Sequence, residues 1–281
     1  NFRKSSTNAF GKLTQNGIKN IIYYGAPGTG KTKFVKDCLD ILDPNRTRTE
    51  WVQFHSGFEY EDFIDGIKPI GIQNGNLNLA LTNGIFKEFC LKAEQNLNEN
   101  FFFIVDEINR ADIAAVFGEP LSLLEENYRG ESIKTKNYTL SKQEFSIPSN
   151  IYFIGMMNDV DKSIDCFDLA LRRRFAWVLM ECDYEVVENA TDKAYKTKCK
   201  NLNQYITGKT YELNGKQEQD GLNLGRAYEI GHSYFLKKEA MSEQQIWNRH
   251  IEPILREYIR TQFGDGEVEK KLETAKKIFV G

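Results

Sequence analysis

One eight-residue motif constrains the fold of this chain more than any other feature. Residues Gly25–Thr32 read Gly-Ala-Pro-Gly-Thr-Gly-Lys-Thr and match the phosphate-loop pattern G-x-x-x-x-G-K-[ST] in full. The apolar stretch Asn20–Tyr24 before it predicts a short buried strand, and Lys31–Leu42 follows with apolar residues at helical spacing. A chance glycine turn does not account for the agreement of motif, strand and helix. The chain is therefore predicted to fold around a strand–loop–helix unit that binds phosphate.

All eight residues of the motif are expected to surround the phosphates of a nucleotide: Gly25, Ala26, Pro27, Gly28, Thr29, Gly30, Lys31 and Thr32. The three glycines allow the backbone to curl so that successive N–H groups point inward, at the positive end of the helix dipole. The Lys31 ammonium group is expected to reach the β- and γ-phosphates, and the Thr32 hydroxyl group is expected to bind Mg²⁺. The motif therefore predicts Mg²⁺ and a nucleoside triphosphate as cofactors.

Two polar stretches follow apolar strands further along the chain. One strand ends in Asp106-Glu107, at the position where α/β folds bind ligands. Asp106 is expected to hold Mg²⁺, and Glu107 is expected to polarise the attacking water as general base. After the next apolar strand, Asn158 and Asp161 are expected to contact the γ-phosphate or to orient that water. The alternatives are an ordinary acidic strand end for Asp106-Glu107 and, for the later stretch, a turn in which Ser163 or Asp161 caps the following helix.

Three adjacent arginines, Arg172, Arg173 and Arg174, stand directly before another apolar stretch. A solvated surface alone does not readily explain such a cluster. An arginine supplied across a subunit boundary neutralises charge that develops on the transferred phosphoryl group. We expect Arg173 and Arg174 to act in this way, with structural salt bridges as the alternative.

The alternation of strands and helices predicts the fold class. Strands are expected at Asn20–Tyr24, Glu50–Phe54, Asn100–Asp106, Asn150–Met156 and Phe175–Met180. This order favours a right-handed, mostly parallel α/β sandwich of three layers. From about residue 181 the chain is richer in Lys and Glu, and Ser242–Arg260 predicts an amphipathic helix. We therefore expect a nucleotide-binding α/β domain over residues 1–180 and a smaller helical domain over residues 181–281.

Composition excludes several functional classes. With 281 residues and a net charge of −3, the chain is not a nucleic-acid-binding polycation. Its five cysteines are scattered without a C-x-x-C pair, which indicates neither a zinc site nor disulfides and favours a cytoplasmic location. No apolar run approaches the roughly 20 residues that span a membrane, and no signal peptide is expected. Because the chain begins with Asn1 rather than Met, we expect a fragment whose N-terminal domain is missing.

Together these motifs resemble the AAA+ ATPases and, within them, the McrB family. The resemblance covers nearly the whole chain from about residue 20, and is carried by Val52–Phe63, Asp106–Ala111, Met157–Asp161, Leu171–Phe175 and Ile230–Phe235. The Met-Asn-x-x-Asp stretch is its most specific element. Asp159, Val160 and Lys162 replace the Thr, Ala and Arg that are usual in the family, whereas Asn158 and Asp161 remain.

The resemblance implies a AAA+ three-layer sandwich with a five-stranded parallel sheet, followed by a helical lid domain. It also implies a homo-oligomeric ring, typically a hexamer, with nucleotide at the subunit boundaries. Members of the family hydrolyse GTP, are stimulated by an McrC-type nuclease partner, and couple hydrolysis to DNA translocation in modification-dependent restriction. GTP is therefore expected in preference to ATP, and DNA recognition is expected to come from a domain outside this fragment.

Two alternatives to a restriction motor remain open. One is a MoxR-like, ATP-driven remodelling chaperone with a protein client, because the Asp106–Ala111 stretch is shared with that branch. The other is a ring scaffold that hydrolyses nucleotide slowly. His232 also has two interpretations, as a nucleotide sensor or as a structural residue that bonds nearby backbone. No residue of the sequence identifies the purine base.

Overall fold

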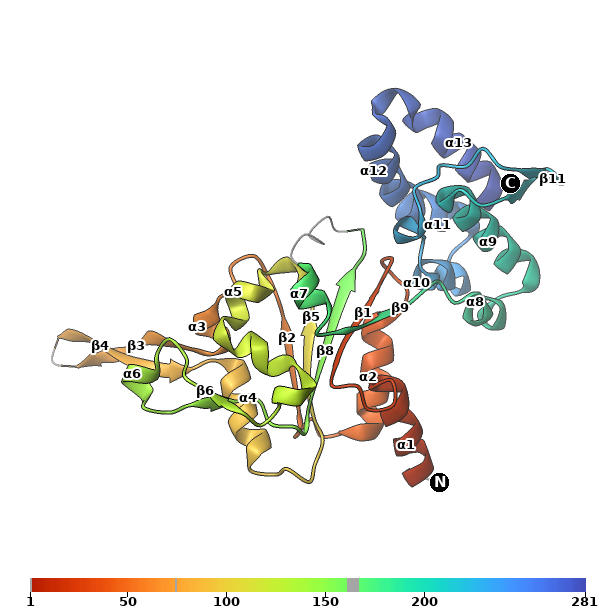
Figure 1. The fold of residues 1–281 in the computed structure, drawn as a ribbon. Coiled ribbons are helices and arrows are strands. Elements are labelled where there is room, and N and C mark those ends of the chain that lie inside the picture. Colours follow the sequence, from red (N-terminus) through yellow and green to blue (C-terminus); the bar gives the residue numbers. More distant parts are fainter. Residues whose placement is uncertain (1, 74, 161–166) are drawn as a thin grey trace. The chain divides into compact units, whose positions relative to one another are not determined.

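The computed structural model describes residues 2–73, 75–160 and 167–281 (Figure 1). They form two compact units. The first contains residues 2–23, 32–73, 75–157 and 167–178, and the second contains residues 24–31, 158–160 and 179–281. The second unit thus combines most of the phosphate loop with the C-terminal helices.

A five-stranded sheet confirms the predicted fold class. Its strand order is β2 (Thr49–Gln53), β5 (Phe101–Asp106), β8 (Ile151–Asn158), β1 (Asn20–Gly25) and β9 (Ala176–Leu179). Strands β2, β5 and β8 pair in parallel register. Backbone N–H groups of Phe153 and Asp159 donate to the carbonyls of Lys19 and Gly25, and this constant sequence offset makes β1 parallel to β8. The carboxyl ends of these strands therefore share one edge of the sheet.

Aromatic side chains cover both faces of this sheet. Phe103 of β5 packs against Phe86 of α4 (Ile85–Glu94) at 4.8 Å between ring centroids. The next residue back, Phe102, points to the opposite face and stacks on Tyr152, which meets Phe10 of α1 (Phe2–Leu13). Successive residues of a strand point to opposite faces, so the run Phe-Phe-Phe-Ile-Val is explained by burial on both sides.

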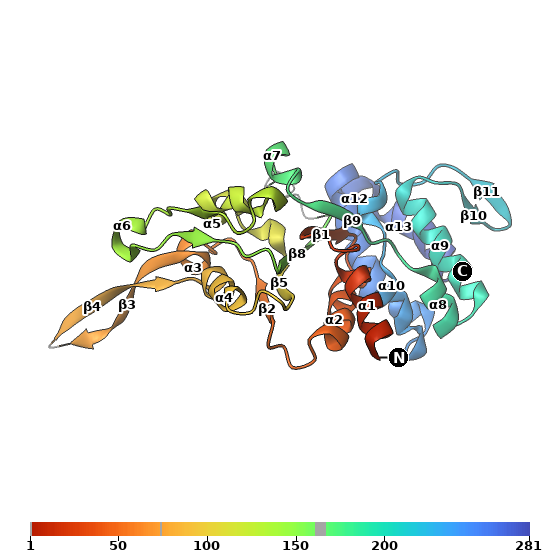
Figure 2. The same cartoon turned by 60° about the horizontal axis from the view of Figure 1, so that its bottom comes forward.

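The remaining elements of the first unit surround that core. They are α2 (Lys31–Leu42), α3 (Tyr60–Phe63), η1 (Ile108–Arg110), α5 (Ile113–Phe117), η2 (Glu119–Leu124), η3 (Glu126–Tyr128), β6 (Ser132–Ile133), α6 (Tyr138–Ser141), β7 (Phe145–Ser146) and α7 (Leu169–Arg172). In addition, β3 (Asp65–Gln73) and β4 (Asn76–Asn83) form an antiparallel hairpin that projects away from the sheet (Figure 2). Its root is fixed by a buried ion pair, with Lys87 Nζ 2.6 Å from Asp65 Oδ2.

The second unit is a helical domain with its own buried core. Its elements are α8 (Tyr184–Ala190), α9 (Lys193–Thr207), β10 (Tyr211–Leu213), β11 (Lys216–Glu218), η5 (Arg226–Tyr228), α10 (His232–Phe235), η6 (Leu236–Glu239), α11 (Glu243–Ile246), η7 (Trp247–Ile251), α12 (Glu252–Phe263), η8 (Asp265–Glu267) and α13 (Val268–Phe279). The single helix predicted over Ser242–Arg260 is divided by the π-helical turn η7. Pro253, just after this turn, has no N–H group for the carbonyl four residues earlier, which accounts for the wider turn.

Among the residues that the structure describes, none of the helices combines the length and the apolar character needed to cross a lipid bilayer.

Candidate nucleotide site and arginine face

The phosphate loop joins β1 to α2 and has the conformation that its glycines predict. Gly25, Gly28 and Gly30 have φ angles of 148°, 79° and 80°, in the region that favours glycine. Lys31 is only 7% exposed, and its Nζ donates to the carbonyl oxygens of Gly25 at 3.0 Å and Ala26 at 2.9 Å. The lysine side chain is therefore folded back onto the backbone of the phosphate loop.

The chemistry of the donors fits a nucleotide with Mg²⁺. Backbone N–H groups of the loop lie at the N-terminus of the twelve-residue helix α2, where the helix dipole favours anions. Thr32 stands in the first turn of that helix, and Asp106 is the last residue of β5. Hydroxyl and carboxylate oxygens are ligands that Mg²⁺ prefers. The loop N–H groups and the buried lysine therefore suit a bound phosphate group, and the oxygen atoms of Thr32 and Asp106 are of the kind that suit Mg²⁺.

A segment of the helical domain covers part of the loop. The N–H of Gly231 donates to Pro27 O at 3.2 Å, and the N–H of Ser233 donates to Gly28 O at 3.0 Å. There is no room for a side chain at Gly231, because a Cβ atom there would lie 2.1 Å from the carbonyl carbon of Gly28. The loop and this segment are thus joined backbone to backbone.

The two acidic residues predicted at the end of β5 are held in different ways. Asp106 Oδ1 accepts the N–H of Glu107 at 3.0 Å. Glu107 has a left-handed backbone, with φ 51° and ψ 43°, which a residue with a side chain seldom adopts. Its Oε2 accepts from Nε of Arg110 at 3.3 Å, and the glutamate side chain is 18% exposed. Uncommon backbone conformations persist where the surroundings fix them, and they cluster at functional sites.

Asn158, the last residue of β8, belongs to the same unit as the loop. The N–H of the next residue, Asp159, donates to Gly25 O at 3.1 Å, so the chain leaving β8 runs beside the first residue of the loop. The role of Asn158 in contacting the γ-phosphate or orienting water stays a prediction. The other residue predicted in this stretch, Asp161, lies outside the described residues.

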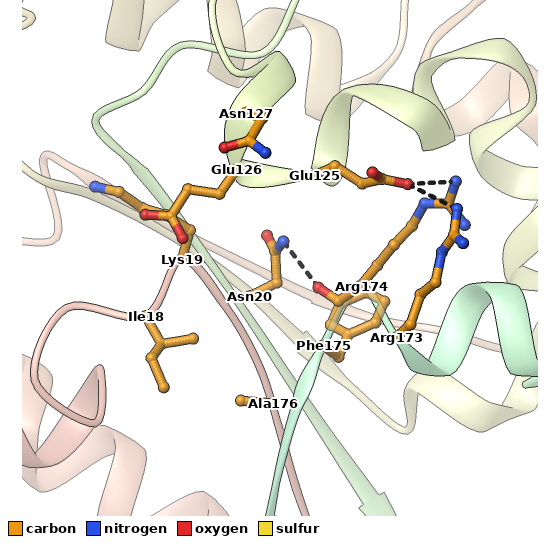
Figure 3. Close-up of a pocket in the computed structure, with 10 residues that line it drawn as sticks. All are labelled: Ile18, Lys19, Asn20, Glu125, Glu126, Asn127, Arg173, Arg174, Phe175 and Ala176. Atoms are coloured by element: carbon orange, nitrogen blue, oxygen red, sulfur yellow. Dashed lines mark hydrogen bonds and ion pairs between the residues drawn. The ribbon is translucent and has the colours of Figure 1, made fainter.

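Arg172 is the last residue of α7, and the next two residues, Arg173 and Arg174, border a cavity of about 700 Å³ in the first unit (Figure 3). We call this surface the arginine face. It is lined by Ile18, Lys19, Asn20, Glu125, Glu126, Asn127, Arg173, Arg174, Phe175 and Ala176. Figure 3 shows the side chains of Arg173 and Arg174 converging on the carboxylate of Glu125, with N···O distances of 3.3 and 2.9 Å. One carboxylate therefore serves two guanidinium groups.

The structure shows that the three arginines differ in exposure and in contacts, a difference that the sequence does not reveal. Arg173 has a side chain that is 67% exposed, and its contact to Glu125 is longer than that of Arg174. Arg174 is 12% exposed and also donates from Nη1 to Ala170 O at 2.7 Å. Arg172 donates from Nε to the carbonyl of Phe167 at 3.3 Å and lies over the ring of Trp177. Arg173 is the member best placed to reach a second molecule.

Asn20, at the first position of β1, forms hydrogen bonds with three other segments at the arginine face. Its Nδ2 donates to Leu124 O at 2.6 Å and also to Arg174 O at 3.0 Å, the second of which Figure 3 shows. Its Oδ1 accepts from Nη2 of Arg129, a guanidinium group whose pKa burial lowers to about 10. Asn20 is 5% exposed, and its contact to Leu124 is buried while those to Arg174 and Arg129 are partly buried.

Three residues of these sites were not predicted from the sequence as site residues: Asn20, Glu125 and Gly231. Asn20 carried a signal, because an amide at the start of an otherwise apolar buried strand needs hydrogen-bond partners. Glu125 carried none, since it stands in a stretch with other acidic residues. Gly231 lies in Ile230–Phe235, one of the stretches that resemble the McrB family, but no pattern in the sequence gave it a role of its own.

Comparison with known families gives two matches. Residues 20–175 match the AAA domain family (dynein-related subfamily), and residues 197–265 match the α-helical lid domain of McrB. The first range contains the loop, the acidic pair, Asn158 and the arginines, and the second contains the segment that covers the loop.

Two curated proteins are similar over most of the chain. The type IV methyl-directed restriction enzyme EcoKMcrB subunit of Escherichia coli (strain K12) is 34% identical over 251 residues, which are 85% of this chain and 54% of that protein. The type II restriction enzyme BsuMI component YdiS of Bacillus subtilis (strain 168) is 29% identical over 273 residues, covering 83% of this chain and 75% of that protein. The chain thus spans about half the length of the first of these relatives.

Proposed function

Because this chain belongs to the AAA domain family, in its dynein-related subfamily, and carries an McrB-type helical lid, we propose that it is the nucleoside-triphosphate-hydrolysing motor of a DNA restriction complex. The observation that carries this proposal is the phosphate loop, with its three left-handed glycines and buried lysine, joined directly to the lid segment. Both curated relatives described above are components of restriction enzymes. Neither a phosphate loop nor a lid alone would support so specific a role.

In this mechanism the chain positions the reactants and stabilises charge. Backbone N–H groups of the loop and the ammonium group of Lys31 hold the phosphates, while Thr32 and Asp106 would hold Mg²⁺, which neutralises charge on the β- and γ-phosphates when bound. Glu107 accepts a proton from the attacking water, and Asn158 orients that water. The fixed left-handed backbone of Glu107 supports this role because it limits the positions of the carboxylate.

We further propose that Arg173 acts in trans at the nucleotide of a neighbouring subunit in a ring, which we expect to be a hexamer. Its exposure of 67% and the length of its contact to Glu125, 3.3 Å, support a guanidinium group that can change partners. Arg174 instead positions the chain, because only 12% of its side chain is exposed and it donates a hydrogen bond to the carbonyl of Ala170. Asp161 keeps its predicted role in orienting water.

GTP is the proposed substrate, in preference to ATP, and the proposed partners are an McrC-like nuclease and DNA. These proposals rest on the similarity to a methyl-directed restriction subunit. Hydrolysis would drive translocation of the complex along DNA. A domain beyond this chain would supply recognition of the target.

The first experiment compares hydrolysis of GTP and ATP by the purified chain with and without an McrC-like nuclease subunit. Phosphate release should be faster with GTP and should rise when the nuclease is added. Glu107→Gln should retain nucleotide binding by calorimetry and lose turnover, since the lost interaction belongs to the transition state. Glu131→Gln, which changes an exposed glutamate of the same unit, is the matched control and should behave as the wild type.

Two outcomes would contradict the proposal. If ATP were hydrolysed at least as fast as GTP in the presence of the nuclease, the base preference would be wrong. If turnover did not respond to the nuclease but did respond to a protein client, a remodelling function would replace the restriction motor.

A further inference from the structure

The segment of the lid that covers the phosphate loop carries a histidine at its centre. Gly231 and Ser233 donate their backbone N–H groups to Pro27 O and Gly28 O, so both neighbours of His232 are fixed to the loop. A residue between two such anchors has little freedom to move away. The side chain of His232 is therefore held at a defined place beside the loop.

One nitrogen of His232 has a partner that fixes its protonation. Nδ1 accepts the backbone N–H of Asp183 at 3.1 Å. A nitrogen that accepts a hydrogen bond carries no proton, so the neutral imidazole has its hydrogen on Nε2. Burial lowers the pKa of His232 from its ordinary value of 6.5, which favours the neutral ring. His232 therefore offers an N–H donor at Nε2.

This donor lies beside Gly30, in the part of the loop that is expected to bind phosphate. A Cβ atom added to Gly30 would lie 2.9 Å from Nε2 of His232 and 3.2 Å from its Cε1. In phosphate loops the backbone N–H groups hold the α- and β-phosphates, and Gly30 directly precedes the lysine of the motif. A phosphate oxygen bound by these N–H groups comes within reach of a donor that touches the same glycine.

From this geometry we infer that His232 is a nucleotide-binding residue supplied by the lid, whose Nε2–H donates to an oxygen of the α- or β-phosphate. The inference rests on the proposed nucleotide site and adds a ligand contact from outside the phosphate-loop motif. Because the contact is to the diphosphate part, it stabilises bound nucleoside diphosphate and triphosphate to a similar extent. Release of the diphosphate after hydrolysis then requires this lid contact to break.

A matched pair of substitutions distinguishes this role from a structural one. In His232→Asn the side-chain carbonyl can still accept the Asp183 N–H, but no donor reaches the position of Nε2. In His232→Gln the longer amide can place an N–H near that position. Hydrogen bonds to charged groups contribute enough that His232→Asn should weaken both Mg²⁺–GDP and Mg²⁺–GTP binding by about 10- to 100-fold, with part of the affinity restored in His232→Gln.

Calorimetry on the full chain decides the question, with thermal unfolding as a check of folding. His250→Gln is the control, a histidine of the same unit on η7, and it should bind both nucleotides as the wild type does. The inference is overturned if His232→Asn binds as tightly as the wild type, or if Asn and Gln weaken binding equally. If the wild type itself bound no nucleotide, the proposed function would fail instead.

A second measurement does not require the His232 variants to fold. The chain has three histidines, so ¹⁵N-histidine labelling gives a spectrum that His55→Gln and His250→Gln suffice to assign. We expect His232 to be the Nε2–H tautomer, with a marked shift of that resonance when Mg²⁺–GDP is added. A spectrum in which nucleotide binds without any change at His232 would overturn the inference.

Discussion

At the phosphate loop the groups that face a ligand are backbone N–H groups, whereas at the arginine face they are guanidinium groups on long side chains. The loop takes its shape from three glycines within six residues, and its lysine bonds to loop carbonyls. The arginine face is held by residues far apart in the sequence. Glu125 forms ion pairs with Arg173 and Arg174, and Asn20 donates a hydrogen bond to the backbone carbonyl of Leu124.

This difference predicts how each region responds to change. A backbone site is rigid, and it is disrupted by atoms that are added to it. A side-chain site can exchange partners, because a guanidinium group paired with a partly exposed carboxylate gains little from that pair. The arginine face is therefore suited to an interaction that forms and breaks, and the loop to one that must keep its geometry.

The largest effect is expected at the arginine face. Arg173→Ala should lower turnover in the assembled ring by about 10³- to 10⁵-fold, the range measured for arginines supplied in trans to phosphoryl transfer. Nucleotide binding should remain. Phosphate release at saturating nucleotide tests this, and Arg260→Ala, which changes an exposed arginine of α12, serves as control.

Mixing subunits tests whether Arg173 acts in trans. A Lys31→Ala subunit keeps its arginine, and an Arg173→Ala subunit keeps its loop, so mixed rings should recover part of the activity that each variant lacks alone. Mass measurement must show that the two variants assemble together. If mixed rings stay inactive at every ratio of the two variants, Arg173 acts only within its own subunit.

A smaller effect is expected when an atom is added at the loop. Gly231→Ala places a Cβ atom in space that the backbone of Gly28 occupies, so loop and lid segment must separate. We expect nucleotide affinity to fall by about 10- to 100-fold, because such overpacking costs about 1–3 kcal/mol. Gly266→Ala has open space around it and should bind as the wild type. Equal affinities for both variants, measured by calorimetry, would show that the loop is less rigid than we infer.

Asn20 belongs to both regions. It lies on β1, the strand that leads to the phosphate loop, and its side chain is hydrogen-bonded to the backbone of Arg174 at the arginine face. Asn20→Ala removes three hydrogen bonds and leaves the buried Arg129 without its acceptor, so the free energy of unfolding should fall by about 2–4 kcal/mol. Nucleotide affinity should change less than turnover in the ring. Urea unfolding and calorimetry measure the two quantities, and an unchanged unfolding midpoint would contradict this account.

The smallest effect is on the pH dependence of stability. Burial lowers the pKa of His232 in the folded chain below 6.5, so the unfolded chain binds the proton more tightly. Stability from this group is present above about pH 6.5 and is lost as the pH falls from there through the folded pKa. Burial shifts the pKa of His250 in the same direction. Thermal unfolding between pH 5 and 8 should become less pH-dependent in His232→Gln, and a curve identical to the wild type would contradict the assignment.

The sequence by itself determined the phosphate loop, the acidic strand end and the parallel sheet. Each of these is encoded within a short stretch. The loop needs glycines at fixed spacing, and a strand buried on both faces needs a continuous apolar run such as Phe101–Val105. Short-range patterns of this kind remain legible because the residues that must cooperate are neighbours along the chain.

Only the tertiary structure shows that Arg173 is the more exposed of the two arginines paired with Glu125, which residues contact Arg174, and that His232 is the lid residue beside Gly30. Asn20 bonds to carbonyls 104 and 154 residues away, and Glu125 pairs with arginines 48 and 49 positions further on. His232 meets Gly30 only because backbone hydrogen bonds seat the lid segment on the loop. No local pattern encodes such pairs, since a hydrogen-bond partner is selected by proximity and burial in the folded chain, and the sequence supplies only residues capable of forming it.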